Sequence, residues 1–147
     1  MVIMQSCPLN PPQGQPPAGA GLPQVKFPSA PESAAAARGY VREVIQREAP
    51  GIAPSRMNDA QLVVSELVTN SVRYGTEPDD SLAVAVGATP NWLRIEVHDP
   101  SRRLPYFKPE STERQRGRGL FIVEELATGW GVDDRPLGKI VWAVLAW

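Results

Sequence analysis

The stretch Ser65-Glu66-Leu67-Val68-Thr69-Asn70-Ser71 lies within the most regular helical pattern of the sequence. At about 100° per residue, one side of a helix over residues 59–74 collects small and apolar side chains, those of Ala60, Val64, Leu67, Val68 and Ser71. Glu66, Asn70 and Arg73 fall within about 60° of one another on another side. A carboxylate and a carboxamide one turn apart offer oxygen ligands that suit Mg²⁺, and the carboxylate can accept a proton. The same spacing also fits a solvated face with a Glu66–Arg73 interaction, so both interpretations stay open.

Helices and strands are expected to alternate on either side of this segment. Asn58 is a suitable N-cap for the helix over residues 59–74, and Gly75 ends it. A helix is also predicted over residues 32–48, where apolar side chains recur at helical spacing. Strand patterns occupy residues 24–28, 81–86, 92–98, 130–133 and 139–146. We therefore predict an α+β fold, a two-layer α/β sandwich whose mostly antiparallel mixed sheet is covered on one face by helices.

The prolines divide the chain into a tail and a domain. Eight of the 16 prolines lie in residues 1–31, where Lys26 is the only charged residue. Because such a segment has little to bury, we expect a disordered tail at residues 1–22 and one domain at residues 23–147. Basic residues do not accompany the tail prolines, which favours a plain leader over a docking ligand.

The overall composition limits the partners and the compartment. Fifteen Lys and Arg against 16 Asp and Glu give a net charge of −1, which argues against direct binding of nucleic acid. Cys7 is the only cysteine, so an internal disulfide is excluded and a reducing cytoplasm fits best. The sequence has no signal-peptide pattern and no apolar run near the about 18 residues of a membrane span. We expect a cytoplasmic protein that does not enter membranes.

Two further places could carry chemistry. Asp99 follows the strand at residues 92–98, where a carboxylate can accept a hydrogen bond from a ligand amino group, although Asp-Pro also suits a plain turn. Gly117-Arg118-Gly119-Leu120 opens a third expected helix, whose free N–H groups would attract phosphate oxygens, and a helix entry without a ligand fits equally well. Residues 100–116 between them hold three prolines and five basic side chains, a pattern that favours a long lid loop.

In this order, the elements resemble the histidine-kinase-like ATPase domain over about residues 24–147. The resemblance is carried by the helical segment 65–71, by a strand followed by Asp99, by a loop and Gly117-Arg-Gly-Leu-Phe-Ile-Val123, and by the final segments Trp130-Gly-Val132 and Gly138-Lys-Ile-Val-Trp142. It is closest to the small bacterial anti-sigma-factor serine/threonine kinases. This resemblance implies the Bergerat fold, with ATP held between helices and lid.

The resemblance also implies roles for single residues. Asn70 would coordinate the Mg²⁺ that bridges the phosphates, Glu66 would be the general base, and Asp99 would recognise the adenine amino group. Arg73 lies on the same side and would meet phosphate. The phosphate-binding helix start would consist of Gly117, Arg118, Gly119 and Leu120.

The chain departs from the family pattern at two places. The glycine-bearing Asp-x-Gly-x-Gly box of the family here consists of Asp99-Pro-Ser-Arg-Arg103. The late-strand hydroxyl that supports the adenine-recognising aspartate is replaced, around Gly138-Lys139-Ile140, by what we expect to be an apolar residue. Both departures concern nucleotide affinity more than fold.

Three functions follow from these observations. The leading hypothesis is an ATP-binding regulator that sequesters a sigma factor, phosphorylates a serine or threonine of an antagonist protein, and forms a homodimer. The retained Glu66 and Asn70 favour this enzyme. The altered box after Asp99 favours an alternative, a non-catalytic nucleotide-binding or partner-binding module. An adaptor acting through the proline-rich residues 1–31 is a third, less favoured hypothesis.

Overall fold

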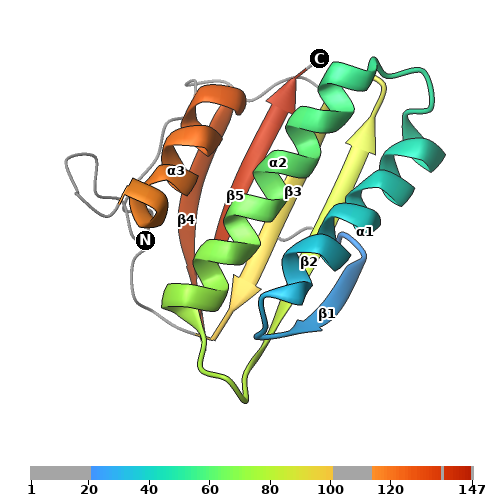
Figure 1. Cartoon of the computed structure of the whole chain (residues 1–147). Helices are drawn as coiled ribbons and strands as arrows, with labels where there is room; N and C mark the ends of the chain where they lie inside the picture. Colours follow the sequence, from blue (N-terminus) through green and yellow to red (C-terminus); the bar gives the residue numbers. More distant parts are fainter. Residues whose placement is uncertain (1–20, 101–113, 137, 147) are drawn as a thin grey trace.

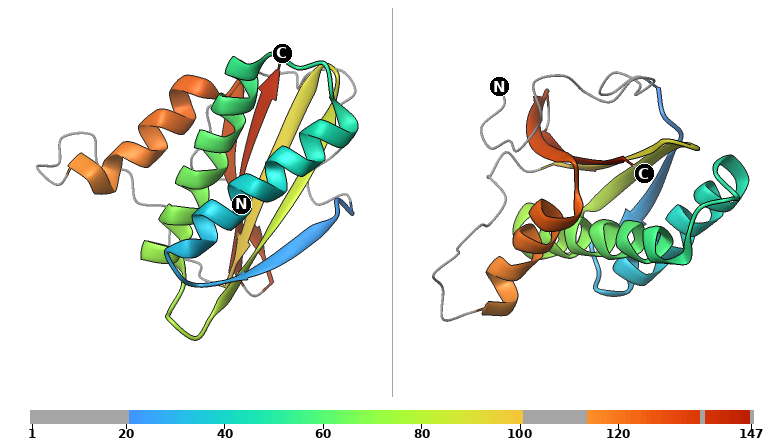
Figure 2. Two further views of the ribbon diagram at one scale, coloured as in Figure 1. Left: turned by 45° about the vertical axis from the view of Figure 1, so that its right-hand side comes forward. Right: turned by 90° about the horizontal axis from the view of Figure 1, so that it is seen from above.

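A computed structural model describes residues 21–100, 114–136 and 138–146, with the backbone alone for residues 114–119. Three helices cover one face of a five-stranded sheet in these residues (Figures 1 and 2). The helices are α1 (Glu32–Glu48), α2 (Pro54–Asn70) and α3 (Arg114–Leu126). The strands are β1 (Gln24–Pro28), β2 (Ser81–Thr89), β3 (Trp92–Asp99), β4 (Gly129–Arg135) and β5 (Gly138–Ala146). The predicted α+β two-layer sandwich is confirmed.

The strand order β1-β2-β3-β5-β4 places β3 at the centre of the sheet, and all four neighbouring pairs are antiparallel. Successive residues of β3 alternate between its two faces because side chains of a strand have a period of two. Leu93, Ile95 and Val97 point toward the helices and pack in one core with Val41 of α1 and Val64 of α2. The sheet and the helix layer therefore share a single core.

The second helix begins and ends differently from the prediction. It starts at Pro54, with Ala53 as the extended N-cap residue, so the prediction of Asn58 as N-cap is wrong. Proline suits the first turn of a helix because its missing N–H has no partner there in any case. At the other end, a π-helical segment η1 (Ser71–Gly75) continues α2 to the expected stop at Gly75.

The third helix also begins earlier than expected. It starts at Arg114, so Gly117 and Gly119 lie inside the helix rather than at its start. Arginine and glutamine at positions 114–116 favour helix, and an interior glycine costs only about 1 kcal/mol. The unpaired N–H groups of the first turn therefore belong mainly to residues 114–117. The proposed tail is outside the described residues up to position 20, and the lid loop is outside them at positions 101–113.

In the described parts of the chain, none of the helices is both long enough and apolar enough to span a membrane.

Candidate functional site

Three elements meet at one end of the sheet, where β3 ends and β5 begins (Figure 1). The π-helical segment η1 at the end of α2 contacts β3 here. Short π-helical turns inside longer helices are frequent at functional sites, because they re-aim side chains that a regular helix would turn away. Here η1 directs one buried hydroxyl at the last residue of β3.

Asp99 is the centre of this cluster and is only 1% exposed. The hydroxyl Oγ of Ser71, the first residue of η1, donates to Asp99 Oδ2 at 3.1 Å. The Nζ of Lys139 donates to the other carboxylate oxygen, Oδ1, at 3.0 Å. Asp99 and Lys139 face each other in the register of β3 and β5, so the pairing of the two strands brings these charges together.

Two glycines let the chain approach this carboxylate closely. A Cβ atom at Gly75 would lie 2.5 Å from Asp99 Oδ2, closer than any real contact. A Cβ atom at Gly138, where φ is +153°, would lie 1.9 Å from the Asp99 carbonyl oxygen. Only glycine fits both positions without moving Asp99, because glycine has no Cβ and tolerates positive φ.

A hydroxyl network ties η1 to the far edge of the sheet. Thr76 Oγ1 donates to the Ser71 carbonyl oxygen at 3.0 Å, and it also contacts Ser29 Oγ just after β1. Both Ser71 and Thr76 are buried. Since each of these side chains has a partner, the segment that positions Ser71 is held from two sides.

The three polar residues of α2 and η1 lie at the same end of the helix layer. Glu66 and Asn70 are partly buried, while Arg73 is exposed. Burial raises the pKa of Glu66 above its ordinary value, and the nearby Arg73 charge opposes the rise. A carboxyl group with a raised pKa is a better proton acceptor than an ordinary one. Asn70 directly precedes Ser71, so the backbone links it to the Asp99 cluster.

The glycine segment of the third helix lies in the helix layer beside α2. Residues 117–119 belong to α3, and α3 contacts α2 along the same layer (Figure 2). Leu120 is buried in the core with Val123. Leu120 therefore has a packing role, which its predicted place in a phosphate-binding segment does not require.

The residue opposite Asp99 differs from the expectation. The sequence pattern predicts an apolar residue around positions 138–140, where the family has a hydroxyl, but the group that reaches Asp99 is the ammonium group of Lys139. Ile140 points to the opposite face of the sheet, since it pairs with His98. The alternation of β5 decides this outcome, because residues 139 and 140 must face opposite sides.

Sequence reasoning also missed Ser71 and Gly75 as members of the site. Ser71 was correctly placed on the buried side of its helix, where a lone hydroxyl among valines and leucines is a signal that it has a polar partner. The partner could not be named without the tertiary structure. The sequence predicts Gly75 only as the end of its helix, a role that the residue also has in the structure.

Oxygen ligands for a nucleotide-bound Mg²⁺ are present at the α2 end of the site. Mg²⁺ typically takes one or two protein ligands and completes its shell with phosphate oxygens and water. The carboxamide of Asn70 and the carboxylate of Glu66, both partly buried and one turn apart, fit that donor set. Among the described residues, no group of three or more His, Cys, Asp or Glu side chains forms a self-contained metal site.

The fold and this buried aspartate define a two-layer α/β protein with a polar site at the carboxyl end of its central strand. Residues 27–145 match the family model of the histidine kinase-like ATPase domain. This match covers most of the chain, so the chain belongs to that family, which connects it with ATP binding. No curated protein matches the chain significantly.

Proposed function

We propose that the protein is an ATP-binding regulator that phosphorylates a serine or threonine of a protein partner, in the manner of the anti-sigma-factor kinases. One observation carries the proposal: the buried Asp99 is held by Ser71, which directly follows Asn70 and lies five residues from Glu66. Base recognition and phosphate chemistry would thereby be assigned to adjacent parts of one rigid segment.

Each residue has a role that its environment supports. Asp99 accepts a hydrogen bond from the adenine amino group, since a carboxylate oxygen has a second lone pair beyond the one that meets Ser71 or Lys139. Asn70 provides an oxygen ligand for the Mg²⁺ that accompanies the triphosphate. Arg73, exposed one turn further along, attracts phosphate by charge.

Glu66 acts as the general base in the transfer step. Its carboxylate accepts the proton of the attacking serine or threonine hydroxyl while that oxygen forms a bond to the γ-phosphorus. The bond between the γ-phosphorus and the bridging oxygen breaks, and ADP leaves with the electron pair. The raised pKa of Glu66 suits this role, because the proton it accepts is then held more firmly.

Isothermal titration with Mg-ATP tests the binding part of the proposal. The wild type should bind Mg-ATP. The variant Asp99→Asn should bind ATP more weakly and discriminate less against GTP, because an amide can both donate and accept hydrogen bonds. Unchanged ATP/GTP selectivity in this variant would remove Asp99 from base recognition. Thermal unfolding of the same samples serves as the control for folding.

Radiolabelled ATP tests the transfer part with partners captured from a lysate. Glu66→Ala should keep ATP affinity within a few-fold and lose about 10²–10⁴-fold in transfer, since a general base acts on the attacking hydroxyl rather than on bound nucleotide. A sigma factor or its antagonist among the captured proteins is the expected partner. Equal labelling by the purified wild type and by Glu66→Ala would refute the role of Glu66 as the general base.

One observation favours a second function, a non-catalytic switch module. Lys139 already forms a buried ion pair with Asp99. The lysine compensates the charge of this carboxylate, which makes the carboxylate a weaker hydrogen-bond acceptor for an adenine amino group. Weak or absent ATP binding by the wild type, together with retained capture of a partner protein, would support the module over the kinase.

A further inference from the structure

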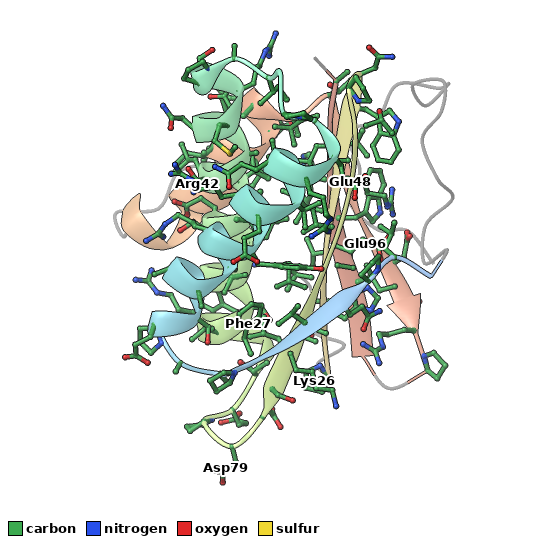
Figure 3. All side chains as sticks on the ribbon, turned by 90° about the vertical axis from the view of Figure 1, so that its right-hand side faces the viewer. Lys26, Phe27, Arg42, Glu48, Asp79 and Glu96 are labelled. Carbon is green, nitrogen blue, oxygen red and sulfur yellow. The ribbon has the colours of Figure 1, made fainter. Side chains whose placement is uncertain are left out.

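The sheet face turned away from the helices is unusual in composition. We call it the outer face, and it is formed in β3 and β5 by Trp92, Arg94, Glu96, His98, Ile140, Trp142 and Val144. Figure 3 shows Glu96 on this side of the sheet, opposite to the helix layer. A sheet face exposed to water does not need large aromatic side chains, yet this one has two tryptophans beside the row of ionisable side chains Arg94, Glu96 and His98.

The central side chains of the outer face are nevertheless buried. Trp92, Arg94 and Glu96 are 3%, 2% and 1% exposed, and Trp142 is 7% exposed. All three helices of the described ranges lie on the other face (Figure 2). Since a single sheet layer cannot bury an arginine on its own outer side, something beyond those helices must cover this face.

Polar atoms on this face show what chemistry the cover should have. Arg94 donates from Nε to Glu96 Oε2 at 2.7 Å, and its guanidinium lies 4.9 Å from the centre of the Trp142 ring. Within the described residues, Arg94 Nη2 and the indole Nε1 atoms of Trp92 and Trp142 are buried donors without a hydrogen-bond acceptor. The face therefore presents three N–H donors beside flat aromatic surfaces and calls for carbonyl acceptors.

The chain itself leads onto this face. Leu22 extends the line of β1, and a Cβ atom at Gly87 would lie 2.7 Å from its Cδ2 atom. Gly87 pairs with Arg94, and paired residues of antiparallel strands point to the same side, so Leu22 lies on the outer face. Residues 1–20 precede this point. Ten residues in polyproline II conformation span about 31 Å, and a five-stranded sheet is about 19 Å wide. The segment before Leu22 is therefore long enough to cross the whole outer face.

We propose that the proline-rich segment at residues 8–17 of this chain binds the outer face. A polyproline II segment has no internal hydrogen bonds, so its carbonyl groups are free to accept from indole and guanidinium donors, and its proline rings pack flat on tryptophan. Residues 1–20 contain no charged side chain that would be lost on burial. Aromatic-lined surfaces recognise such segments in other proteins, and here Arg94 supplies the basic group from the receptor side.

The lack of basic residues in the tail does not oppose binding to the outer face. The absence of basic residues beside the prolines favoured a plain leader, because basic residues often accompany proline-rich docking motifs. On the outer face the cation belongs to the sheet, as Arg94, and its partner Glu96 is already in place. A basic ligand would meet a like charge there, whereas an uncharged one does not.

The single cysteine makes a direct test with the full chain feasible. Cys7 is labelled with a nitroxide, and the indole and backbone N–H resonances are recorded with the spin label oxidised and then reduced. We expect a several-fold intensity loss at Trp92 and Trp142, with little effect on Leu62, which is exposed on α2. A second sample mixes chains that carry the spin label at natural nitrogen abundance with ¹⁵N-enriched chains that carry no spin label. Intensity loss in this sample can come only from contacts between chains, so the comparison separates these from contacts within one chain.

A matched pair of tail variants completes the test. Replacing Pro8, Pro11, Pro12, Pro16 and Pro17 by serine should speed hydrogen exchange of the Trp92 and Trp142 indole groups several-fold, while Trp130, which faces the helices, keeps its rate. Replacing Gln5, Gln13 and Gln15 by serine should change nothing. Broadening only between chains would assign the face to a second copy and overturn the proposal, as would indole exchange that is unaffected by the proline changes.

Discussion

Replacing Lys139 by methionine is the most direct test of the buried cluster. The Lys139 side chain is 4% exposed and the Asp99 side chain 1% exposed, and their charged atoms are 3.0 Å apart. Methionine keeps the length of the apolar stem, with sulfur in place of the Cδ methylene, and removes the ammonium group. The variant therefore leaves the Asp99 carboxylate buried without its ion-pair partner, while the Ser71 hydroxyl still donates to it.

The expected loss of stability is large for one substitution. Removing one partner of a buried ion pair typically costs about 3–5 kcal/mol, because the other charge stays desolvated. We expect the lower end, about 3 kcal/mol, since the hydroxyl of Ser71 still donates to the carboxylate. For a domain of this size that corresponds to a decrease in melting temperature of roughly 12 °C.

Urea and thermal unfolding measure this loss, with two reference variants. Lys26→Met removes an exposed lysine from β1 and should change stability by no more than about 0.5 kcal/mol. The double variant Lys139→Met/Asp99→Asn should regain most of the loss, because no charge is then buried and the asparagine can still accept from Ser71.

Two results would refute the reasoning. The first is that Lys139→Met unfolds at the same urea concentration as Lys26→Met, which would mean that the ion pair is solvated or dispensable. Alternatively, the double variant could be as unstable as Lys139→Met, in which case the aliphatic stem rather than the charge would matter.

Three further outcomes follow from the site. Gly75→Ala should destabilise by about 1–3 kcal/mol because its Cβ would displace the buried carboxylate, whereas Gly39→Ala, in an exposed helix position with open space, should stabilise; equal effects in urea unfolding would contradict the close packing. Burial raises the pKa of Glu66 above its ordinary value of 4.5, so the wild type loses stability as the pH rises from 4.5 through the raised pKa of the folded protein. The melting temperature of Glu66→Gln should therefore match that of the wild type at low pH and exceed it as the pH rises. A difference that is independent of pH would refute this reasoning. In titrations with Mg-ATP, the affinity of Asn70→Ala for Mg-ATP should fall about tenfold or more and that of Arg73→Ala only a few-fold, because a metal ligand holds the whole triphosphate whereas an exposed cation is screened. The reverse order would exclude Asn70 as a metal ligand.

The periodic elements could be predicted from the sequence, and the ends of the helices less well. The strand at residues 92–98 follows from its alternation, and its observed range differs by one residue. The start of α2 was misplaced because Asn58 is a good N-cap residue by type, while Pro54 carried the stronger positional signal. The π-helical segment has no recognised sequence signature here, so the direction of Ser71 could not be derived.

The members of the site were harder to predict when they depend on strand pairing. Asp99 stood out because it follows a strand, but Lys139 is 40 residues away along the chain and becomes its neighbour only through the pairing of β3 with β5. These strands are not consecutive, and the register between them is set by the whole sheet. The sequence shows that residue 139 is a lysine, but it does not show that the partner of this lysine is Asp99.

The alternation of β3 has a consequence for how the protein tolerates change. Its odd-numbered residues form the core and end in Asp99, while its even-numbered residues form the ladder of Arg94, Glu96 and His98. A slip of one residue against β5 would exchange the two sets, placing an arginine and a glutamate among valines and leucines. Mispaired forms of this strand are therefore far higher in energy than the native one, because each would bury charged side chains without their partners.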